Sequence, residues 1–303
     1  MVSDAVFEKL LKIEPENTHR DVLMSGATTF KIGGPADVFI EAQSEETLSK
    51  IIKLCKAEGV PFMLIGAGSN LLVSDKGIEG VVCRLGEGFD YVEVSDKKIH
   101  AGASVSLAKL AKKAQRASLS GLEFASGIPG SLGGAIFMNA GAYGGEMKDV
   151  VVKTRYMDEN GDILEVSGDD HDFSYRHSIF SGGNKHIISS EMELDFKNPD
   201  EILETMKDLN ARRKEKQPLE KPSAGSAFKR PEGYFAAKLI EDSGLKGVSV
   251  GGAEVSKKHA GFIVSDGNAT AKDVCDLIAL VQKTVKEKFG VSIEPEIKIT
   301  GRE

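Results

Sequence analysis

The sequence of 303 residues has no tryptophan, few aromatic residues and more acidic than basic side chains. Aromatic residues make up 6% of the chain, too few for a protein that binds single-stranded nucleic acid by stacking its bases. The formal net charge is −7, and duplex binding depends on neutralising phosphates, so we expect no nucleic-acid partner. With 33 glycines but only 9 prolines, the composition is typical of neither collagen nor a disordered chain.

Cysteine is also scarce, with Cys55, Cys83 and Cys275 as its three occurrences. None of them forms a C-x-x-C pair, so we expect no structural zinc, no other metal site and no disulfide framework. Cys55 and Cys275 fall within apolar patterns of helical period, where cysteine behaves as a small hydrophobic residue. This usage indicates a reducing compartment.

Long apolar runs are missing as well. No stretch reaches the roughly 18 apolar residues of a membrane-spanning helix. Residues 1–20 lack the basic start and the apolar segment of a secretory signal peptide. We therefore expect a cytoplasmic protein without a membrane partner.

What the chain does have is a succession of helix and strand patterns. Helices are predicted to begin at Ser44, Ser106, Pro199 and Thr270, the first two ending at Gly59 and Gly121. The segments PFMLIG, HIISSEMEL and IEPEIKIT are typical of strands, and Asn160-Gly161 of a two-residue hairpin. Near residue 197 a glycine-rich mixture of helices and strands gives way to a compact α+β segment, which predicts a domain boundary there.

The segment Gly66-Ala67-Gly68-Ser69-Asn70-Leu71-Leu72 follows a predicted strand and contains G-x-G. A Rossmann fingerprint needs a third glycine at position 71 and then a helix, but Leu71 stands there and a strand pattern continues. The remaining interpretations are an ordinary glycine turn and a nest of backbone N–H groups suited to a pyrophosphate.

A second glycine-rich segment runs from residue 127 to residue 144, with glycines at 127, 130, 133, 134, 141 and 144. Glycine costs backbone entropy on folding, so this density favours close approach of the backbone to a flat or phosphate-bearing ligand. A flexible linker is the alternative, but Ile128, Leu132 and Ile136 indicate burial.

Three further motifs are ambiguous by themselves. In Phe173-Ser174-Tyr175-Arg176-His177-Ser178 the arginine could be a surface ion pair. PSAGSAFKRP at 222–231 has the composition of a Ser/Gly turn, and IEPEI at 293–297 that of a solvent-facing strand. Residues 211–230 hold seven basic and two acidic side chains, a local charge of +5 that fits either a solvated helix end or a pocket for a phosphorylated small molecule.

In combination the motifs are specific. TTFKIGGPA (28–36), GAGSNLL (66–72), GIPGSLGGA (127–135), MNAGAYG (138–144), FSYRHS (173–178) and AGSAFK (224–229) resemble, in this order, the UDP-N-acetylenolpyruvoylglucosamine reductase family. The resemblance runs from Thr28 to Gly301. It implies an α+β fold: an FAD-binding unit of the vanillyl-alcohol-oxidase type with subdomains at 1–85 and 86–197, and an α+β substrate-binding domain at 198–303.

The same resemblance implies FAD and NADPH as cofactors and a UDP-amino sugar as substrate. Its cofactor-binding positions are Gly66, Ala67, Gly68, Ser69, Asn70 and Leu71 at the pyrophosphate, and Gly127, Ile128, Pro129, Gly130, Ser131, Gly133, Gly134, Asn139, Ala140, Gly141 and Ala142 along the flavin. Its substrate-binding positions are Tyr175, Lys229 and Arg230.

Three catalytic positions carry over from the family. Arg176 would stabilise the charge that builds on the substrate carboxylate after hydride transfer. Ser226 would protonate the adjacent carbon, and Glu296 would orient the enol intermediate. Glu294 is the rival acid, and the register against Ile-Lys-Ile-Thr-Gly favours Glu296.

Two departures from the family pattern concern the substrate. No tyrosine occurs between Arg176 and Ser226, so the chain resembles the shorter branch, which lacks a tyrosine-bearing loop. Arg230 stands where many relatives have asparagine, and its guanidinium could hold a diphosphate through two hydrogen bonds.

Rival functions are a flavin oxidoreductase of the same fold acting on an alcohol or hydroxy acid, and a nucleotide-binding regulator without turnover.

Overall fold

The computed structural model describes residues 1–303, which form two compact units. Unit 1 comprises residues 1–20, 37–67 and 80–212, and unit 2 comprises residues 21–36, 68–79 and 213–303. Unit 2 therefore includes two N-terminal segments besides the C-terminal third of the chain. The division at residues 85 and 197 stays a prediction.

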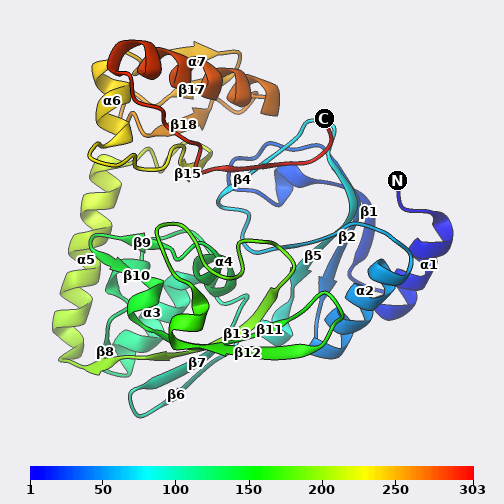
Figure 1. Ribbon diagram of the computed structural model, residues 1–303. Coiled ribbons are helices and arrows are strands. Elements are labelled where there is room, and N and C mark those ends of the chain that lie inside the picture. Colours follow the sequence, from blue (N-terminus) through cyan, green and yellow to red (C-terminus); the bar gives the residue numbers. More distant parts are fainter. The chain divides into compact units, whose positions relative to one another are not determined.

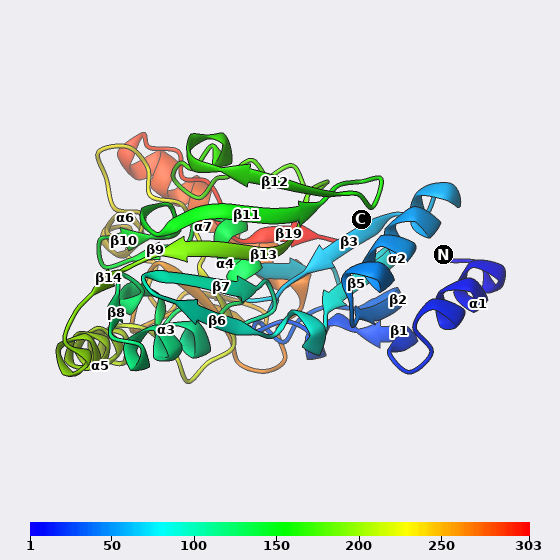
Figure 2. The ribbon, with the colours of Figure 1, turned by 90° about the horizontal axis from the view of Figure 1, so that it is seen from below.

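Two larger sheets lie mostly in unit 1. One has the order β1-β2-β5-β3, formed by β1 (Thr18–Leu23), β2 (Pro35–Ala42), β5 (Ile78–Leu85) and β3 (Phe62–Ile65). The other is antiparallel, with the order β12-β11-β13-β7-β6 that Figure 2 shows, formed by β12 (Ile163–Ser167), β11 (Val151–Met157), β13 (His186–Glu193), β7 (Lys98–Gly102) and β6 (Val92–Ser95). Two small pairs complete the strands: β8 (Leu119–Ser120) with β14 (Asp195–Phe196), and β9 (Gly141–Ala142) with β10 (Gly145–Glu146).

The helices of the chain are labelled in Figure 1. They are α1 (Asp4–Ile13), α2 (Glu45–Ala57), α3 (Leu107–Arg116), α4 (Leu132–Phe137), α5 (Pro199–Lys216), α6 (Ala236–Asp242) and α7 (Ala271–Phe289). Short 3-10 turns are η1 (Met24–Gly26), η2 (Glu87–Phe89), η3 (Glu123–Ala125), η4 (Met147–Asp149) and η5 (Gly168–His171). None of these helices combines the length and the apolar character needed to cross a bilayer.

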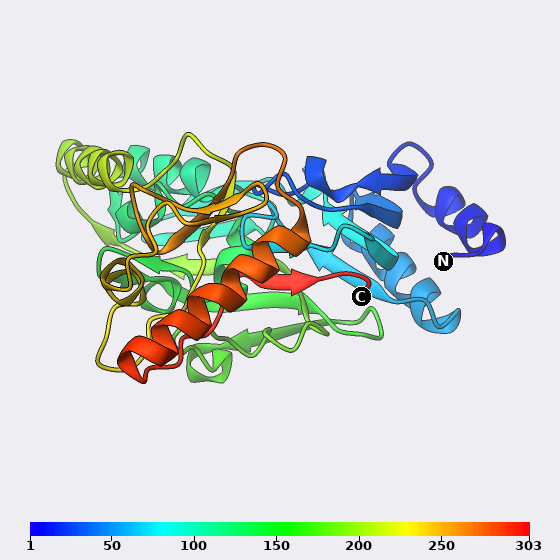
Figure 3. The same cartoon turned by 90° about the horizontal axis from the view of Figure 1, so that it is seen from above.

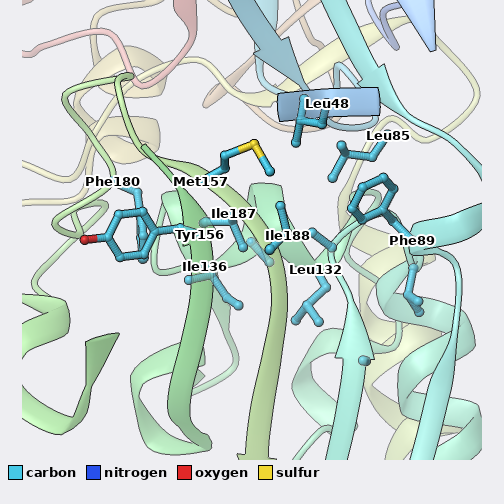
Figure 4. Packing of buried hydrophobic residues seen from close by; sticks show 14 of the residues in the cluster. Leu48, Leu85, Phe89, Leu132, Ile136, Tyr156, Met157, Phe180, Ile187 and Ile188 are labelled. Carbon is cyan, nitrogen blue, oxygen red and sulfur yellow. The ribbon is translucent and has the colours of Figure 1, made fainter. Parts of the chain in front are cut away.

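The core of unit 1 joins α4 to the five-stranded sheet. Figure 4 shows Leu132 and Ile136 of α4 gathered with Ile187 and Ile188 of β13, and all four are buried. Cys55 of α2 lies in the same cluster, where burial raises the pKa of its thiol to about 12. The thiol therefore acts as a hydrophobic side chain, as the sequence predicts.

Unit 2 has its own sheet and core. Strands β15 (Ser223–Ser226), β18 (Phe262–Ser265), β17 (Ala253–Val255) and β16 (Ser249–Val250) form a sheet in that order, and β4 (Leu71–Val73) pairs in parallel with β19 (Lys298–Thr300). The long helix α7, in orange and red in Figure 3, contacts β16 and β17. Its apolar stripe is buried: Val274, Leu277, Ile278, Val281 and Val285.

The predicted helix starts are confirmed by their caps. Side-chain oxygens of Ser44, Ser106 and Thr270 accept hydrogen bonds from backbone N–H groups in the first turns of α2, α3 and α7. One predicted helix end is wrong. Helix α3 ends at Arg116 rather than Gly121, because Ser118 adopts a left-handed conformation with φ +60°.

The hairpin and the last strand also differ from their predictions. The loop between β11 and β12 runs from residue 158 to 162, because the Asp158 carboxylate accepts from the N–H groups of both Asn160 and Asp162 and closes a longer turn. Strand β19 covers only residues 298–300 of the predicted IEPEIKIT. Pro295 instead forms an isolated antiparallel bridge with Phe228.

Candidate active site

In unit 1, Gly66 at the start of the glycine turn (66–72) lies against Ser131 of the glycine-rich segment (127–144). Helix α4 begins at Ser131, whose Oγ accepts a hydrogen bond from the N–H of Gly134 at 3.4 Å. A Cβ atom built on Gly66 would lie 2.4 Å from this Oγ, and one on Gly133 would lie 3.0 Å from the Cβ of Ala103. A side chain at Gly66 would therefore displace the Ser131 hydroxyl that caps α4, and one at Gly133 would press against Ala103.

Gly68 lies in unit 2, where the same motif continues. Its φ is +63°, and a Cβ atom there would lie 2.2 Å from the carbonyl oxygen of Ala27. No helix follows: the chain enters β4 at Leu71, so the predicted rejection of a Rossmann site is confirmed. A left-handed turn packed against backbone on one side fits the close backbone approach that a pyrophosphate requires.

The segment after α4 forms a tight hairpin. Strands β9 and β10 pair with Ala142 opposite Gly145, leaving Tyr143 and Gly144 as the two turn residues, both with positive φ. Such a turn matches the twist of a hairpin. The carbonyl oxygen of Gly141 in β9 accepts a hydrogen bond from Nη2 of Arg176 at 3.4 Å. The proposed flavin segment thus contacts the proposed catalytic arginine directly.

Arg176 itself sits in a strained turn. Ser174 and His177 exchange two backbone hydrogen bonds of 3.2 Å, which leaves Tyr175 and Arg176 at the tip. Arg176 has φ +55°, an uncommon conformation for a residue other than glycine, asparagine or aspartate. Its guanidinium lies over the ring of Tyr175, 5.0 Å from the centroid. Tyr175 is 51% exposed, so this pair is accessible to a substrate.

Buried contacts hold this turn on both sides. The hydroxyl of Ser178 donates to the carbonyl oxygen of Phe137 at 2.8 Å, at the end of α4. His171 is fully buried and stacks on Phe173 with the ring planes 7° apart. Burial lowers the pKa of His171, so its neutral ring serves as a structural support. No sequence signal marks His171, because a single histidine carries no pattern.

In unit 2, Ser226 and Glu296 lie on adjacent segments. The N–H of Glu296 donates to the carbonyl oxygen of Ala227, the residue after Ser226, at 2.9 Å. Ser226 is exposed at the end of β15, Gly225 before it has φ +74°, and Glu296 is half-buried. The backbone segments that carry the predicted serine and the predicted acid are therefore hydrogen-bonded side by side.

The rival acid has a different partner. The carboxylate of Glu294 lies 3.1 Å from Nζ of Lys229, and the carbonyl oxygen of Glu294 accepts from the N–H of Lys229 at 2.8 Å. Glu294 is exposed and engaged in this ion pair. Glu294 is thus paired with Lys229, whereas the backbone of Glu296 is bonded to the residue after Ser226.

Two residues that carried no predicted catalytic role tie this region together. The amide of Asn70 donates to the carbonyl oxygen of Glu296 at 3.1 Å. The hydroxyl of Thr29 donates to the carbonyl oxygen of Ser223 at 2.8 Å. The backbone N–H of Thr29 donates to the carbonyl oxygen of Gly68 at 3.3 Å. The motif TTFKIGGPA thus supports both the glycine turn and the serine strand, a role visible only in three dimensions.

Arg230 lies in a turn with two exposed aromatic residues. Its guanidinium is 4.0 Å from the centroid of the Phe235 ring, and its Nε donates to the carbonyl oxygen of Tyr234 at 3.3 Å. Phe235 is 61% exposed and Tyr234 48%. An arginine stacked on an aromatic ring is a suitable surface for a phosphate-bearing ligand.

Comparisons with known proteins agree with this geometry. Residues 217–300 match the C-terminal domain of UDP-N-acetylenolpyruvoylglucosamine reductase, and residues 36–167 match an FAD binding domain. A UDP-N-acetylenolpyruvoylglucosamine reductase of Clostridioides difficile (strain 630) is 48% identical, with 100% of each chain covered. One from Caldanaerobacter subterraneus subsp. tengcongensis is 52% identical, with 99% of each chain covered.

Solved structures agree with these matches in family and in fold. The crystal structure of UDP-N-acetylenolpyruvylglucosamine reductase from Thermus caldophilus has a TM-score of 0.80 and 36% identity, covering 92% of this chain and 98% of that one. Phl p 4.0202, a glucose dehydrogenase, is 14% identical with a TM-score of 0.50 over 65% of this chain and 45% of that one, a likeness in fold alone. The predicted α+β fold class, an FAD-binding fold of the vanillyl-alcohol-oxidase type with a C-terminal domain, is confirmed.

Proposed function

Because the chain belongs to the UDP-N-acetylenolpyruvoylglucosamine reductase family, it is an FAD-dependent oxidoreductase, and we propose which of its residues carry the reaction. The reaction reduces the enolpyruvyl ether of UDP-N-acetylglucosamine to UDP-N-acetylmuramate in peptidoglycan precursor synthesis. A bound FAD would supply the hydride-transfer chemistry, with NADPH as the hydride source and the terminal carbon of the enolpyruvyl group as the acceptor. We further propose a cytoplasmic location, where NADPH is available.

The cofactor would lie along the two glycine motifs. Gly66 and Gly68 keep side chains away from the turn after β3, and backbone that carries no side chain can approach the pyrophosphate. The backbone of residues 127–142 would line the flavin, since the side-chain amide of Asn139 is bonded within the protein. The support for this assignment is the pair of close approaches at Gly66 and Gly68, where a Cβ atom would collide with Ser131 or Ala27.

Arg176 would bind the substrate carboxylate. Hydride addition at the terminal carbon leaves negative charge on the adjacent carbon and its carboxylate, and a planar guanidinium can bind that group through two hydrogen bonds. The contact with the Gly141 carbonyl and the Tyr175 ring would hold the guanidinium in a defined direction.

Ser226 would then donate the proton. A serine hydroxyl is a weak acid, so its placement matters more than its acidity. The single observation that carries this assignment is the hydrogen bond between the N–H of Glu296 and the carbonyl of Ala227, which sets the acid beside the serine segment. Glu296 would orient the enol-like intermediate, while Lys229 and Arg230 would bind the diphosphate.

The test is an NADPH-oxidation assay with the purified protein. We expect bound, releasable FAD and NADPH consumption that depends on the enolpyruvyl UDP-sugar. Consumption that instead follows a simple alcohol or hydroxy acid would support a different flavin oxidoreductase. Protein that binds no flavin would contradict the function altogether.

A further inference from the structure

Asn139 is completely buried, and every polar group of its side chain is used. It is 0% exposed and has φ +41°, a left-handed conformation that asparagine tolerates better than most residues. Its Nδ2 donates to Oε2 of Glu146 at 2.7 Å and to the carbonyl oxygen of Ser174 at 3.1 Å. Its Oδ1 accepts from the N–H of Lys148 at 2.9 Å. The side chain therefore has no amide hydrogen left for a cofactor.

The bond to Ser174 reaches the turn that carries Arg176. Ser174 is the first residue of this turn and pairs with His177 through two backbone hydrogen bonds. A turn whose tip residue has φ +55° is strained and persists only where the surroundings hold it. The hydrogen bond from Asn139 stabilises this turn. Asn139 is itself fixed in a buried position after α4, where its backbone N–H donates to the carbonyl oxygen of Ile136.

We propose that Asn139 is a positioning residue, which sets the direction of the Arg176 guanidinium by fixing the Ser174 carbonyl. The proposal rests on the proposed function, because it takes Arg176 as the group that binds the substrate carboxylate. Asn139 thereby links the segment that lines the cofactor to the turn that meets the substrate. Its side chain acts through the arginine.

The substitution Asn139→Gly separates this role from a general structural one. Glycine adopts positive φ without strain, so the backbone conformation is kept while the three side-chain bonds are lost. We expect FAD content and NADPH-driven flavin reduction to stay close to those of the unaltered protein. Flavin reoxidation by the enolpyruvyl UDP-sugar should slow about 10²-fold, as for a catalytic group displaced by about 1 Å. Asn160→Gly, in the β11–β12 loop, is the matched control and should change neither rate.

A double-mutant cycle with Arg176→Ala tests whether the effect passes through the arginine. If it does, adding Asn139→Gly to Arg176→Ala should slow flavin reoxidation by less than twofold further, a non-additive result. Equal slowing by Asn139→Gly in both backgrounds would overturn the proposal. If Arg176→Ala alone leaves reoxidation fast, the assignment of Arg176 fails, whatever the result for Asn139.

A second variant distinguishes a positioning role from a general loss of the fold. Asn139→Asp keeps the size and the acceptor for the Lys148 N–H, but places a carboxylate against the Ser174 carbonyl and Glu146. It should show the same selective slowing of reoxidation. If both variants lose FAD, or if Asn139→Asp reoxidises at the normal rate, Asn139 is not a positioning residue.

Discussion

The side-chain amide of Asn70 donates a hydrogen bond to the carbonyl oxygen of Glu296, although 226 positions separate the two residues. The carbonyl oxygen of Asn70 accepts in turn from the N–H of Lys298 at 2.9 Å, at the start of the β4–β19 pair. The glycine turn proposed for the pyrophosphate and the segment that carries the proposed acid are thus one hydrogen-bonded structure within unit 2.

From this relationship we predict that Asn70→Asp is destabilising. The aspartate carboxylate cannot donate to the Glu296 carbonyl, so one part-buried hydrogen bond is lost and two acceptors face each other. The free energy of unfolding should fall by about 1–3 kcal/mol in urea titrations. Asn268→Asp, at an exposed asparagine of the same unit, is the control and should change stability little. Equal stability of the two variants would contradict the prediction.

For Arg176 we predict a selective loss. Arg176→Ala should retain FAD and normal flavin reduction by NADPH, but reduction of the substrate should slow about 10²-fold or more, since one aimed electrostatic donor is lost. Arg176→Lys should also be poor, because an ammonium cannot replace the planar guanidinium. Stopped-flow flavin spectra separate the two half-reactions. Similar slowing of both would instead indicate a structural role.

Ser226 and Ser223 form a natural comparison within β15. Ser226→Ala should leave flavin reduction by NADPH unchanged and lower turnover roughly 10²- to 10⁴-fold, the usual contribution of a placed general acid. Ser226→Cys should keep more activity than Ser226→Ala, since a thiol can still deliver a proton. Ser223→Ala should remain active, because Thr29 binds the backbone carbonyl of Ser223, which this change preserves. The assignment of Ser226 fails if both alanine variants turn over at the same rate.

Glycine positions offer a test of the cofactor turn. Gly68→Ala should weaken FAD binding, because the added Cβ would lie 2.2 Å from the Ala27 carbonyl oxygen and the turn would have to move. Gly26→Ala is the control, since no atom lies within 4 Å of its Cβ position. Flavin absorbance after dialysis measures retention. Retention of FAD by Gly68→Ala to the same extent as by Gly26→Ala would remove this turn from the binding site.

The buried histidines predict a loss of stability in acid. Burial lowers the pKa of His186 to about 4 from an ordinary value of 6.5, and Asp158 opposes the shift only in part. Below pH 6.5 the unfolded chain binds a proton that the folded chain does not, so the free energy of unfolding should fall as the pH drops toward 4. A shift of this size corresponds to roughly 3 kcal/mol.

Urea unfolding at pH 7 and at pH 5 measures this effect. His171 and His259, whose pKa values burial also lowers, add to the loss in the same direction. The variant His186→Gln should therefore show a smaller decrease between the two pH values than the unaltered protein. An identical decrease would show that His186 does not contribute.

The local structure and the family both follow from short segments of the sequence. Helix starts at Ser44, Ser106 and Thr270, and the strand that follows the glycine turn in place of a Rossmann helix, all depend on residues a few positions apart. Caps, hydrophobic periods and glycine turns act over such distances, so they can be recognised before folding is known. The order of the motifs was specific enough to indicate the family and its cofactor.

Which distant residues meet depends on the folding of the whole chain. The pairs Thr29–Ser223, Asn70–Glu296 and Asn139–Ser174 join segments through single hydrogen bonds to backbone carbonyls. A carbonyl is present at every residue, so no side-chain pattern marks which one will be bound. The same holds for unit 2, which takes residues 21–36 and 68–79 from the N-terminal part of the chain. Those contacts follow from how the complete chain packs, and they place Ser226 beside Glu296.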